Sequence, residues 1–253
     1  MSERPFSVDR DLFEILRGGE KRGAALAETL WDLLPLPGRT LEVGVGAGVV
    51  ADAVGADGRW IAGVDLSPVR LRRAFRRLMG AAARADARAL PFATGSYDAA
   101  YLVWLQIVPD HQVIAEAARV LRPRGRLVVV TGPHTSGDDD EIGAIEARLD
   151  SLHPWREEPA DMALRGSAAG LKLVARRQWV IPLEQAPEEA AQGIEARDLA
   201  TLWALDDNLV DKARAEATTA LRSLAEPAVP RLRRVAYPLL VFERTSATVA
   251  ATS

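Results

Sequence analysis

The sequence of 253 residues contains no cysteine, which excludes disulfide bonds, thiolate nucleophiles and thiolate metal ligands among these residues. Only 3 histidines are present, and no group of histidine and acidic residues has the spacing of a metal site. No apolar run approaches the roughly 18 residues of a membrane-spanning helix, and the first residues lack the pattern of a signal peptide. We therefore expect a cytoplasmic protein with no bound metal and no membrane partner.

An excess of charge of one sign is lacking as well. With 32 basic and 35 acidic residues the formal net charge is −3, so a basic surface for nucleic acid is not expected. Arginines cluster within residues 70–77 on a predicted helix, and we interpret them as a solvated helix face rather than a phosphate-binding stripe. The expected partner is a small molecule rather than a nucleic acid, and the composition leaves both a monomer and a homodimer open.

Hydrophobic and polar segments alternate regularly along the first half of the sequence. This alternation predicts an α/β fold with a doubly wound, mostly parallel sheet, which binds its ligand at the carboxyl ends of the strands. The predicted strands lie at 39–44, 59–66, 82–87, 97–104 and 126–132, with helices between them.

Two further strands are predicted at 171–181 and 235–244, which completes a seven-stranded, Rossmann-like sheet. The mostly helical stretch 183–232 between them is too long for a turn, and we expect a helical cap over the ligand face. A rigid helical extension or a dimer surface is the alternative. The predicted organisation is one domain with an N-terminal helical lid segment, a cofactor-binding core, the cap and a final strand, at 1–37, 38–182, 183–232 and 233–244.

The stretch LEVGVGAGVVADAV, residues 41–54, leaves a predicted strand, passes three glycines and enters a predicted helix. Glycine adopts positive φ and lets the backbone approach a ligand closely, so Gly44, Gly46 and Gly48 are typical of a nucleotide-type loop. The third glycine of the dinucleotide fingerprint is missing, because Val49 stands in its place. On the glycines alone, a purely structural turn remains open.

Two acidic residues lie at the ends of predicted strands, at the ligand edge. Asp65 lies 17 residues (65 − 48) after Gly48, and a carboxylate there can accept hydrogen bonds from both hydroxyls of a ribose. Asp86 lies at the end of the third predicted strand and can accept a hydrogen bond from the amino group of adenine. The alternatives are an acid at a helix start for Asp65 and a turn acid for Asp86.

Four blocks in order, LEVGVGAG, GVDLSP, ARADARALPFATGSYDAAYLVWLQIVPD and AARVLRPRGRLVVV, resemble the class I S-adenosylmethionine-dependent methyltransferases. The resemblance spans residues 38–132 and is to the subgroup that includes the ubiquinone and menaquinone C-methyltransferases. It implies S-adenosylmethionine as the cofactor. The residues that it places around the cofactor are Gly44, Gly46 and Gly48 at the methionine moiety, Glu42 at its amino group, Asp65 at the ribose, Leu66, Asp86 and Ala87 at the adenine, and Val103.

Methyl transfer from a sulfonium is an in-line displacement, so the protein must mainly align the acceptor and exclude water. The resemblance implies transfer to an oxygen, nitrogen or carbon of a small molecule, and we expect a role in secondary metabolism. The alternative is a cofactor-binding protein that has been repurposed for a non-methylating reaction such as a cyclisation.

Candidates for contact with the acceptor follow the predicted strands. Gln106 stands where the family often has a histidine, and His134 follows the fifth strand in a predicted loop. Either side chain is a candidate for catalysis, with a surface loop residue as the alternative for His134. Trp104, Trp155 and Trp203 are predicted at or beyond the ligand edge, where aromatic walls suit an apolar acceptor, with a place in the core as the alternative. Two other tryptophans, Trp31 and Trp60, lie within predicted core elements and are expected to be structural.

Overall fold

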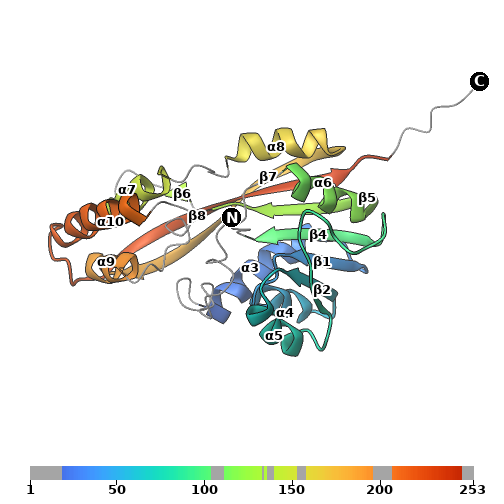
Figure 1. Cartoon of the computed structure of the whole chain (residues 1–253), viewed down its shortest axis with the longest axis horizontal. Helices are drawn as coiled ribbons and strands as arrows, with labels where there is room; N and C mark the ends of the chain where they lie inside the picture. Colours follow the sequence, from blue (N-terminus) through green and yellow to red (C-terminus); the bar gives the residue numbers. More distant parts are fainter. Residues whose placement is uncertain are drawn as a thin grey trace, which may run out of the picture.

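A computed structural model describes residues 19–103, 111–132, 134–135, 140–152, 158–195 and 207–246 of the chain. The strands are β1 (Arg39–Val43), β2 (Trp60–Asp65), β3 (Ala82–Arg84), β4 (Tyr97–Val103), β5 (Leu121–Val130), β6 (His134–Thr135), β7 (Leu171–Gln185) and β8 (Arg231–Arg244). They form one sheet in the order β3-β2-β1-β4-β5-β8-β6, with β7 also paired to β8 (Figure 1). β1 to β5 are parallel to one another, and β8 is antiparallel to β5, β6 and β7. The predicted doubly wound, mostly parallel sheet of seven strands is confirmed, and the two-residue β6 is an addition to it.

Helices cover both faces of this sheet. They are α3 (Gly19–Leu33), α4 (Val49–Gly55), α5 (Pro68–Arg77), α6 (His111–Val120), α7 (Glu141–Asp150), α8 (Pro159–Ala168), α9 (Pro187–Glu195) and α10 (Asp207–Arg222). One hydrophobic core includes Leu26 of α3, Val50 of α4 and Ala74 of α5. A second core includes Ile114 of α6 and Met162 of α8. No helix in the described ranges is both long and apolar enough to span a membrane.

The two tryptophans that were predicted to be structural residues of core elements differ in their burial. The indole Nε1 of Trp31 donates a hydrogen bond of 2.9 Å to the carbonyl oxygen of Val54, which joins α3 to α4 as expected of a structural residue. Trp60 lies within β2, but its side chain is 46% exposed and does not belong to the hydrophobic core. It is the first residue of β2, at the amino-terminal edge of the sheet, where its ring stacks on Tyr97 and beneath the guanidinium of Arg39.

β7 and β8 form a ribbon that extends past the parallel strands. β8 pairs with β5 only as far as the Val130–Leu239 pair, whereas it pairs with β7 from Leu171–Arg244 to Gln185–Arg231. The ribbon therefore runs on beyond the carboxyl end of β5 and carries α9 and α10 (Figure 1). Residues 183–185 and 231–232, which were predicted to belong to the cap, are strand residues of this ribbon.

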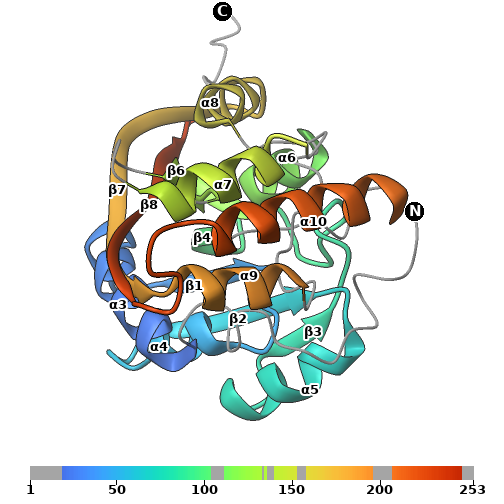
Figure 2. The same ribbon diagram turned by 90° about the vertical axis from the view of Figure 1, so that its left-hand side faces the viewer.

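The cap has a hydrophobic core of its own, and α7 belongs to it although it precedes β7 in the chain. Seen from the cap side, α7, α10 and α9 lie together in front of the core strands (Figure 2). They pack through buried aliphatic residues of all three helices, namely Ile142, Ile145, Leu149, Ala190, Ala191, Ile194, Val210, Ala213, Ala217 and Leu221. The cap is therefore built from two separate stretches of the sequence rather than from one insertion.

A buried arginine fixes α7 to the ribbon. Arg233 of β8 is 5% exposed; its Nε donates to Asp140 Oδ1 at 2.8 Å and its Nη2 donates to Glu146 Oε2 at 2.8 Å. Its Nη1 donates to Gln185 Oε1 of β7. Asp140 in turn caps α7 by accepting a hydrogen bond of 2.8 Å from the backbone N–H of Gly143. These contacts join α7, β7 and β8 at the root of the cap.

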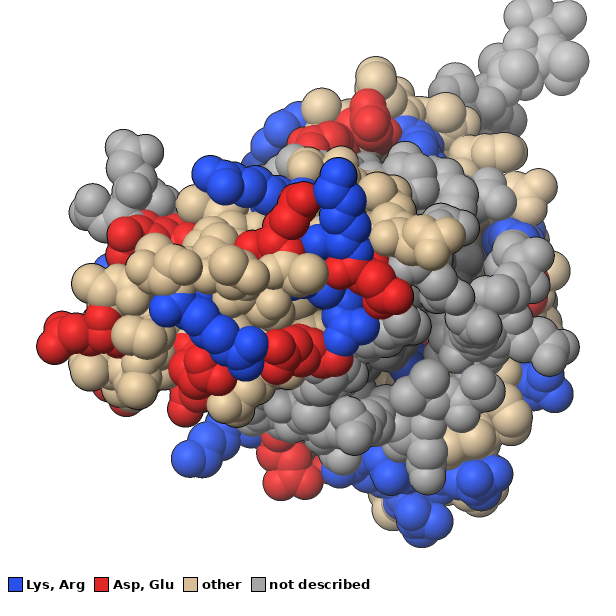
Figure 3. Space-filling view, turned by 60° about the vertical axis from the view of Figure 1, so that its left-hand side comes forward, with Lys and Arg blue, Asp and Glu red and all other residues tan. Residues whose placement is uncertain are grey.

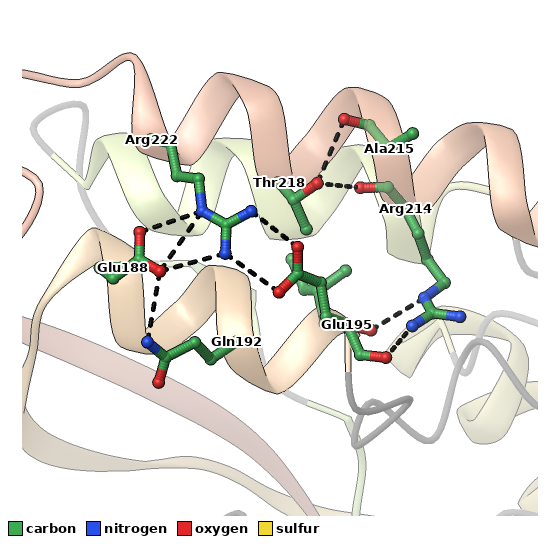
Figure 4. A network of polar contacts seen from close by, with 8 residues as sticks. Glu188, Gln192, Glu195, Arg214, Ala215, Thr218 and Arg222 are labelled. Atoms are coloured by element: carbon green, nitrogen blue, oxygen red, sulfur yellow. Dashed lines mark hydrogen bonds and ion pairs between the residues drawn. The ribbon is translucent and has the colours of Figure 1, made fainter.

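On the outside of the cap, exposed charges pair between α9 and α10. Arg222 of α10 donates to Glu188 and Glu195 of α9, with nitrogen–oxygen distances of 2.7 to 3.3 Å (Figure 4). Basic and acidic side chains are interspersed over this part of the surface (Figure 3). Solvated pairs of this kind orient the helices and contribute little to stability.

Candidate cofactor site

The glycine loop follows β1 and turns back along β2 into α4. The backbone N–H groups of Gly44 and Val45 both donate to the carbonyl oxygen of Val64 at 2.8 Å, which holds the loop against the end of β2. Gly46 has a φ of 53°, and a Cβ built on it meets no atom within 4 Å, so this residue borders open space. Such a position leaves room for a ligand to lie against the backbone.

Gly48 serves packing within the protein. Its φ is 82°, and a Cβ built on it would lie 3.0 Å from the Cα of Ala74 in α5. The loop can therefore approach α5 only because residue 48 has no side chain. Contact of Gly44, Gly46 or Gly48 with a methionine moiety stays a prediction.

Asp65 is the last residue of β2 and ties the loop to the strand end. Its Oδ2 accepts a hydrogen bond of 2.9 Å from the backbone N–H of Gly46, and its Oδ1 accepts one of 2.8 Å from that of Ser67. Each carboxylate oxygen can accept a second hydrogen bond, so the pair of oxygens remains suited to the two hydroxyls of a ribose. Asp65 also lies just before α5 and accepts a hydrogen bond from Ser67, the residue that caps this helix. The alternative interpretation, an acid at a helix start, therefore describes part of its role.

Glu42 of β1 is buried beside the loop, with only 3% of its surface exposed. Its Oε2 accepts a hydrogen bond of 3.0 Å from the hydroxyl of Tyr101 on the neighbouring strand β4. Burial raises the pKa of Glu42 to about 8, and the nearby charge of Asp65 acts in the same direction. At neutral pH the carboxyl therefore holds its proton, and a cationic group placed beside it would convert it to the carboxylate. This behaviour suits the ammonium group of an amino acid.

Asp86 is held by Arg88. The backbone N–H of Arg88 donates to Asp86 Oδ1 at 2.9 Å, and its Nη2 donates to Oδ2 at 2.6 Å. These hydrogen bonds lower the pKa of the Asp86 carboxyl. The turn-acid interpretation therefore describes what Asp86 does in the structure, and its contact with adenine stays a prediction. Nearby, Ala87 and Val103 are buried, and Leu66 is partly buried.

The structure describes only one of the candidates for contact with the acceptor, namely His134. Trp104, Gln106, Trp155 and Trp203 lie outside the described residues. His134 lies in β6, whose backbone pairs with Ala236 of β8, and not in a loop as predicted. Within the described ranges, no three histidine or acidic residues are grouped in a way that could hold a metal ion.

Arg72 and Arg76 of α5 are exposed, as expected of a solvated face, but Arg70 and Arg77 differ from this interpretation. Arg77 reaches the glycine loop, where its Nη1 donates to the carbonyl oxygen of Ala47 at 3.0 Å. Arg70 has its Nε and Nη2 atoms buried, with no hydrogen-bond partner for either in the structure as described. Both residues were missed as site candidates, because composition alone does not show which arginine of a cluster turns inward.

The chain is similar in sequence to known proteins. A methyltransferase domain family matches residues 41–129. The demethylmenaquinone methyltransferase of Tropheryma whipplei is 37% identical over 99 residues, which are 37% of this chain but only 41% of that relative. The 27-O-demethylrifamycin SV methyltransferase of Amycolatopsis mediterranei is 30% identical over 205 residues, 70% of this chain and 74% of that relative.

A solved structure gives the same result for the fold. The YcgJ protein of Bacillus subtilis superposes with a TM-score of 0.59 over 88% of this chain and 99% of that chain, at 19% identity. The chain therefore belongs to the class I S-adenosylmethionine-dependent methyltransferases, and S-adenosylmethionine is its cofactor.

Proposed function

We propose that the protein transfers the methyl group of S-adenosylmethionine to a hydroxyl oxygen of a small molecule of secondary metabolism. The observation that carries this proposal is the length of the match to the rifamycin O-methyltransferase. That match covers 70% of this chain, whereas the methyltransferase family model covers 89 residues (129 − 41 + 1), about a third of it. It therefore extends well beyond the cofactor-binding strands, toward the part of the chain that faces an acceptor.

The residues of the site fit the cofactor. The open side of Gly46 admits it, the two oxygens of Asp65 suit its ribose, and Glu42 suits its ammonium group. When bound, the cofactor supplies a methyl group on a positively charged sulfur, which needs no further activation by a metal or an acid. The residues of the chain must fix the position of the methyl group and align the acceptor oxygen with the bond between the methyl carbon and the sulfur.

In this proposal the cap selects the acceptor. It stands beyond the carboxyl ends of the parallel strands, the edge at which sheets of this class bind their ligands. The match to the 27-O-demethylrifamycin SV methyltransferase covers more of the chain than the core, which supports an acceptor hydroxyl. In this proposal the cap and residues around β6 contact the acceptor, and His134 is the candidate base for its hydroxyl.

The test is a methyl-transfer assay with labelled S-adenosylmethionine and three acceptor panels: hydroxyl-bearing polyketides and phenols, amines, and quinols that accept a methyl group at carbon. We expect label in the first panel, with release of S-adenosylhomocysteine in equal amount. Asp65→Ala provides a variant with impaired cofactor binding, and Asp52→Ala, an exposed position of α4, is its matched control.

Two results contradict the proposal in different ways. Label only in the quinols or the amines shows that the acceptor atom is wrong. Binding of S-adenosylhomocysteine without transfer to any panel favours the alternative, a cofactor-binding protein repurposed for a reaction such as a cyclisation.

A further inference from the structure

Arg70 in the first turn of α5 holds two buried donors that nothing in the described structure satisfies. Its Nε and Nη2 atoms are shielded from solvent and have no hydrogen-bond partner there. A guanidinium is charged at any physiological pH, and burying its donors unpaired costs free energy. Such an arrangement is expected where a ligand completes the pairing.

The two unsatisfied atoms form one side of the guanidinium fork. Two other arginines of this protein use the same pair of atoms on a carboxylate. Arg88 places its Nε and Nη2 at 3.0 and 2.6 Å from the two oxygens of Asp86. Arg222 places its Nε and Nη2 at 3.0 Å from the oxygens of Glu188. The unsatisfied side of Arg70 therefore has the shape and charge to receive a carboxylate through two hydrogen bonds.

The position of Arg70 on α5 places it beside the glycine loop. Residues 70, 74 and 77 lie on one side of a helix. Ala74 packs against Gly48, and Arg77 donates to the carbonyl of Ala47. Arg70 is one turn further toward the start of α5, and that start follows Asp65 by three residues (68 − 65). Long side chains in a helix lean toward its amino-terminal end, which here is the ligand edge of the sheet.

We propose that Arg70 binds the α-carboxylate of S-adenosylmethionine through its Nε and Nη2. Adenine and ribose are neutral, so the carboxylate is the one anionic group of the cofactor. Glu42 suits the ammonium group, and Arg70 supplies the opposite charge for the other end of the same amino acid. The sequence pattern does not indicate this role, because an arginine within a cluster of arginines is expected to face solvent.

The test is a binding experiment with two ligands, S-adenosylhomocysteine and its analogue that lacks the carboxylate, 5′-S-(3-aminopropyl)-5′-thioadenosine. Affinities are measured by calorimetry for the wild type, Arg70→Met, Arg70→Lys and Arg72→Met. Arg72 is an exposed arginine of the same helix and provides the matched control. No acceptor is present, so the outcome does not depend on whether the proposed O-methylation is correct.

Arg70→Met is expected to bind S-adenosylhomocysteine about 10- to 100-fold more weakly than the wild type, as for the loss of a bidentate charged pair. The analogue is expected to bind both proteins equally. Arg70→Lys should recover part of the affinity, because it keeps the charge and loses the fork, and Arg72→Met should resemble the wild type.

Two results overturn the proposal. The first is an unchanged affinity of Arg70→Met for S-adenosylhomocysteine. The second is an equal loss of affinity for both ligands, which indicates a packing role. If Arg70→Met does not fold, the comparison of the two ligands on the wild type and on Arg70→Lys decides the question.

Discussion

The hydroxyl of Tyr101 donates a hydrogen bond of 3.0 Å to the buried carboxyl of Glu42, across the pairing of β4 with β1. Tyr101 is itself fully buried, and its pKa lies well above the ordinary value because of burial and the neighbouring Glu42. The hydrogen bond partly offsets the cost of burying Glu42, whose pKa still rises to about 8. A protonatable group is therefore kept next to the cofactor loop at a cost in stability.

Replacing Glu42 by glutamine is expected to stabilise the free protein as the pH rises. Between the ordinary pKa of 4.5 and about 8, the unfolded carboxyl loses its proton while the folded one keeps it. The folded state then binds more protons, so wild-type stability falls with rising pH in this window and levels off above it. The glutamine side chain does not titrate, and the advantage of the variant should grow to the order of a few kcal/mol at about pH 8.

Denaturant unfolding of both proteins from about pH 4.5 to about pH 9 measures this difference, because the range spans both pKa values of the carboxyl. A difference in unfolding free energy that is constant over the whole range contradicts the assignment of the titrating group. With saturating S-adenosylhomocysteine the advantage of Glu42→Gln should shrink, because the ammonium group of the ligand stabilises the ionised carboxylate of the wild type.

Asp65→Ala is expected to weaken cofactor binding by about 2 to 4 kcal/mol, since it removes two hydrogen bonds to the ribose and releases the backbone of Gly46. Asp86→Ala should cost less, because one contact with adenine is at stake and Arg88 already occupies the carboxylate. Calorimetric titration with S-adenosylhomocysteine gives both values. Equal and negligible losses at the two positions mean that the alignment with the family motifs is wrong.

Arg233→Met is expected to loosen the root of the cap. The substitution leaves the carboxylates of Asp140 and Glu146 without their cation in a largely buried place, which destabilises by about 3 to 5 kcal/mol. The variant Arg233→Met with Asp140→Asn and Glu146→Gln should recover part of this loss. Arg222→Met, which breaks only exposed pairs, should have a much smaller effect in the same thermal unfolding experiment.

The sequence was sufficient for the sheet and the cofactor loop, because both depend on local signals. A strand buried on both faces, three glycines and a carboxylate at a strand end are all visible in residues 39–65. The extent of the β7–β8 ribbon was not predictable. Its far end, residues 182–185, reads PLEQ, without the continuous apolar character of the core strands. Such residues pair as strands only because β8 runs alongside them.

The membership of α7 in the cap and the inward turn of Arg70 depend on contacts between distant segments. Asp140 and Glu146 meet Arg233, 93 and 87 residues away in the chain, and no periodicity connects them. The same limit applies to Arg70, because the burial of its Nε and Nη2 atoms depends on how α5 packs and not on the residues next to it in sequence. Residue type and spacing therefore predicted which class of ligand binds, but they did not predict which side chains lie around the ligand site.

The cap is expected to act as a lid that orders over the bound acceptor. The ladder between β7 and β8 continues from the core into the cap, so the ribbon itself should not bend. Closure would instead involve α9, α10 and the N-terminal segment, which is described only from residue 19 onward. Hydrogen exchange with S-adenosylhomocysteine alone should protect the glycine loop. Addition of the acceptor should then protect amides of α9 and α10, because a closed site excludes water from the reacting centre.

The ribbon residues 171–185 provide the internal control, since their exchange should be the same in all states. If the loop becomes protected while α9 and α10 do not change with the acceptor, the cap is a rigid extension or a dimer surface. Sedimentation velocity on the same samples separates these two possibilities, because a dimer surface predicts a concentration-dependent mass. In either case the choice of acceptor would have to come from residues nearer the strand ends, with His134 on β6 as the first to substitute.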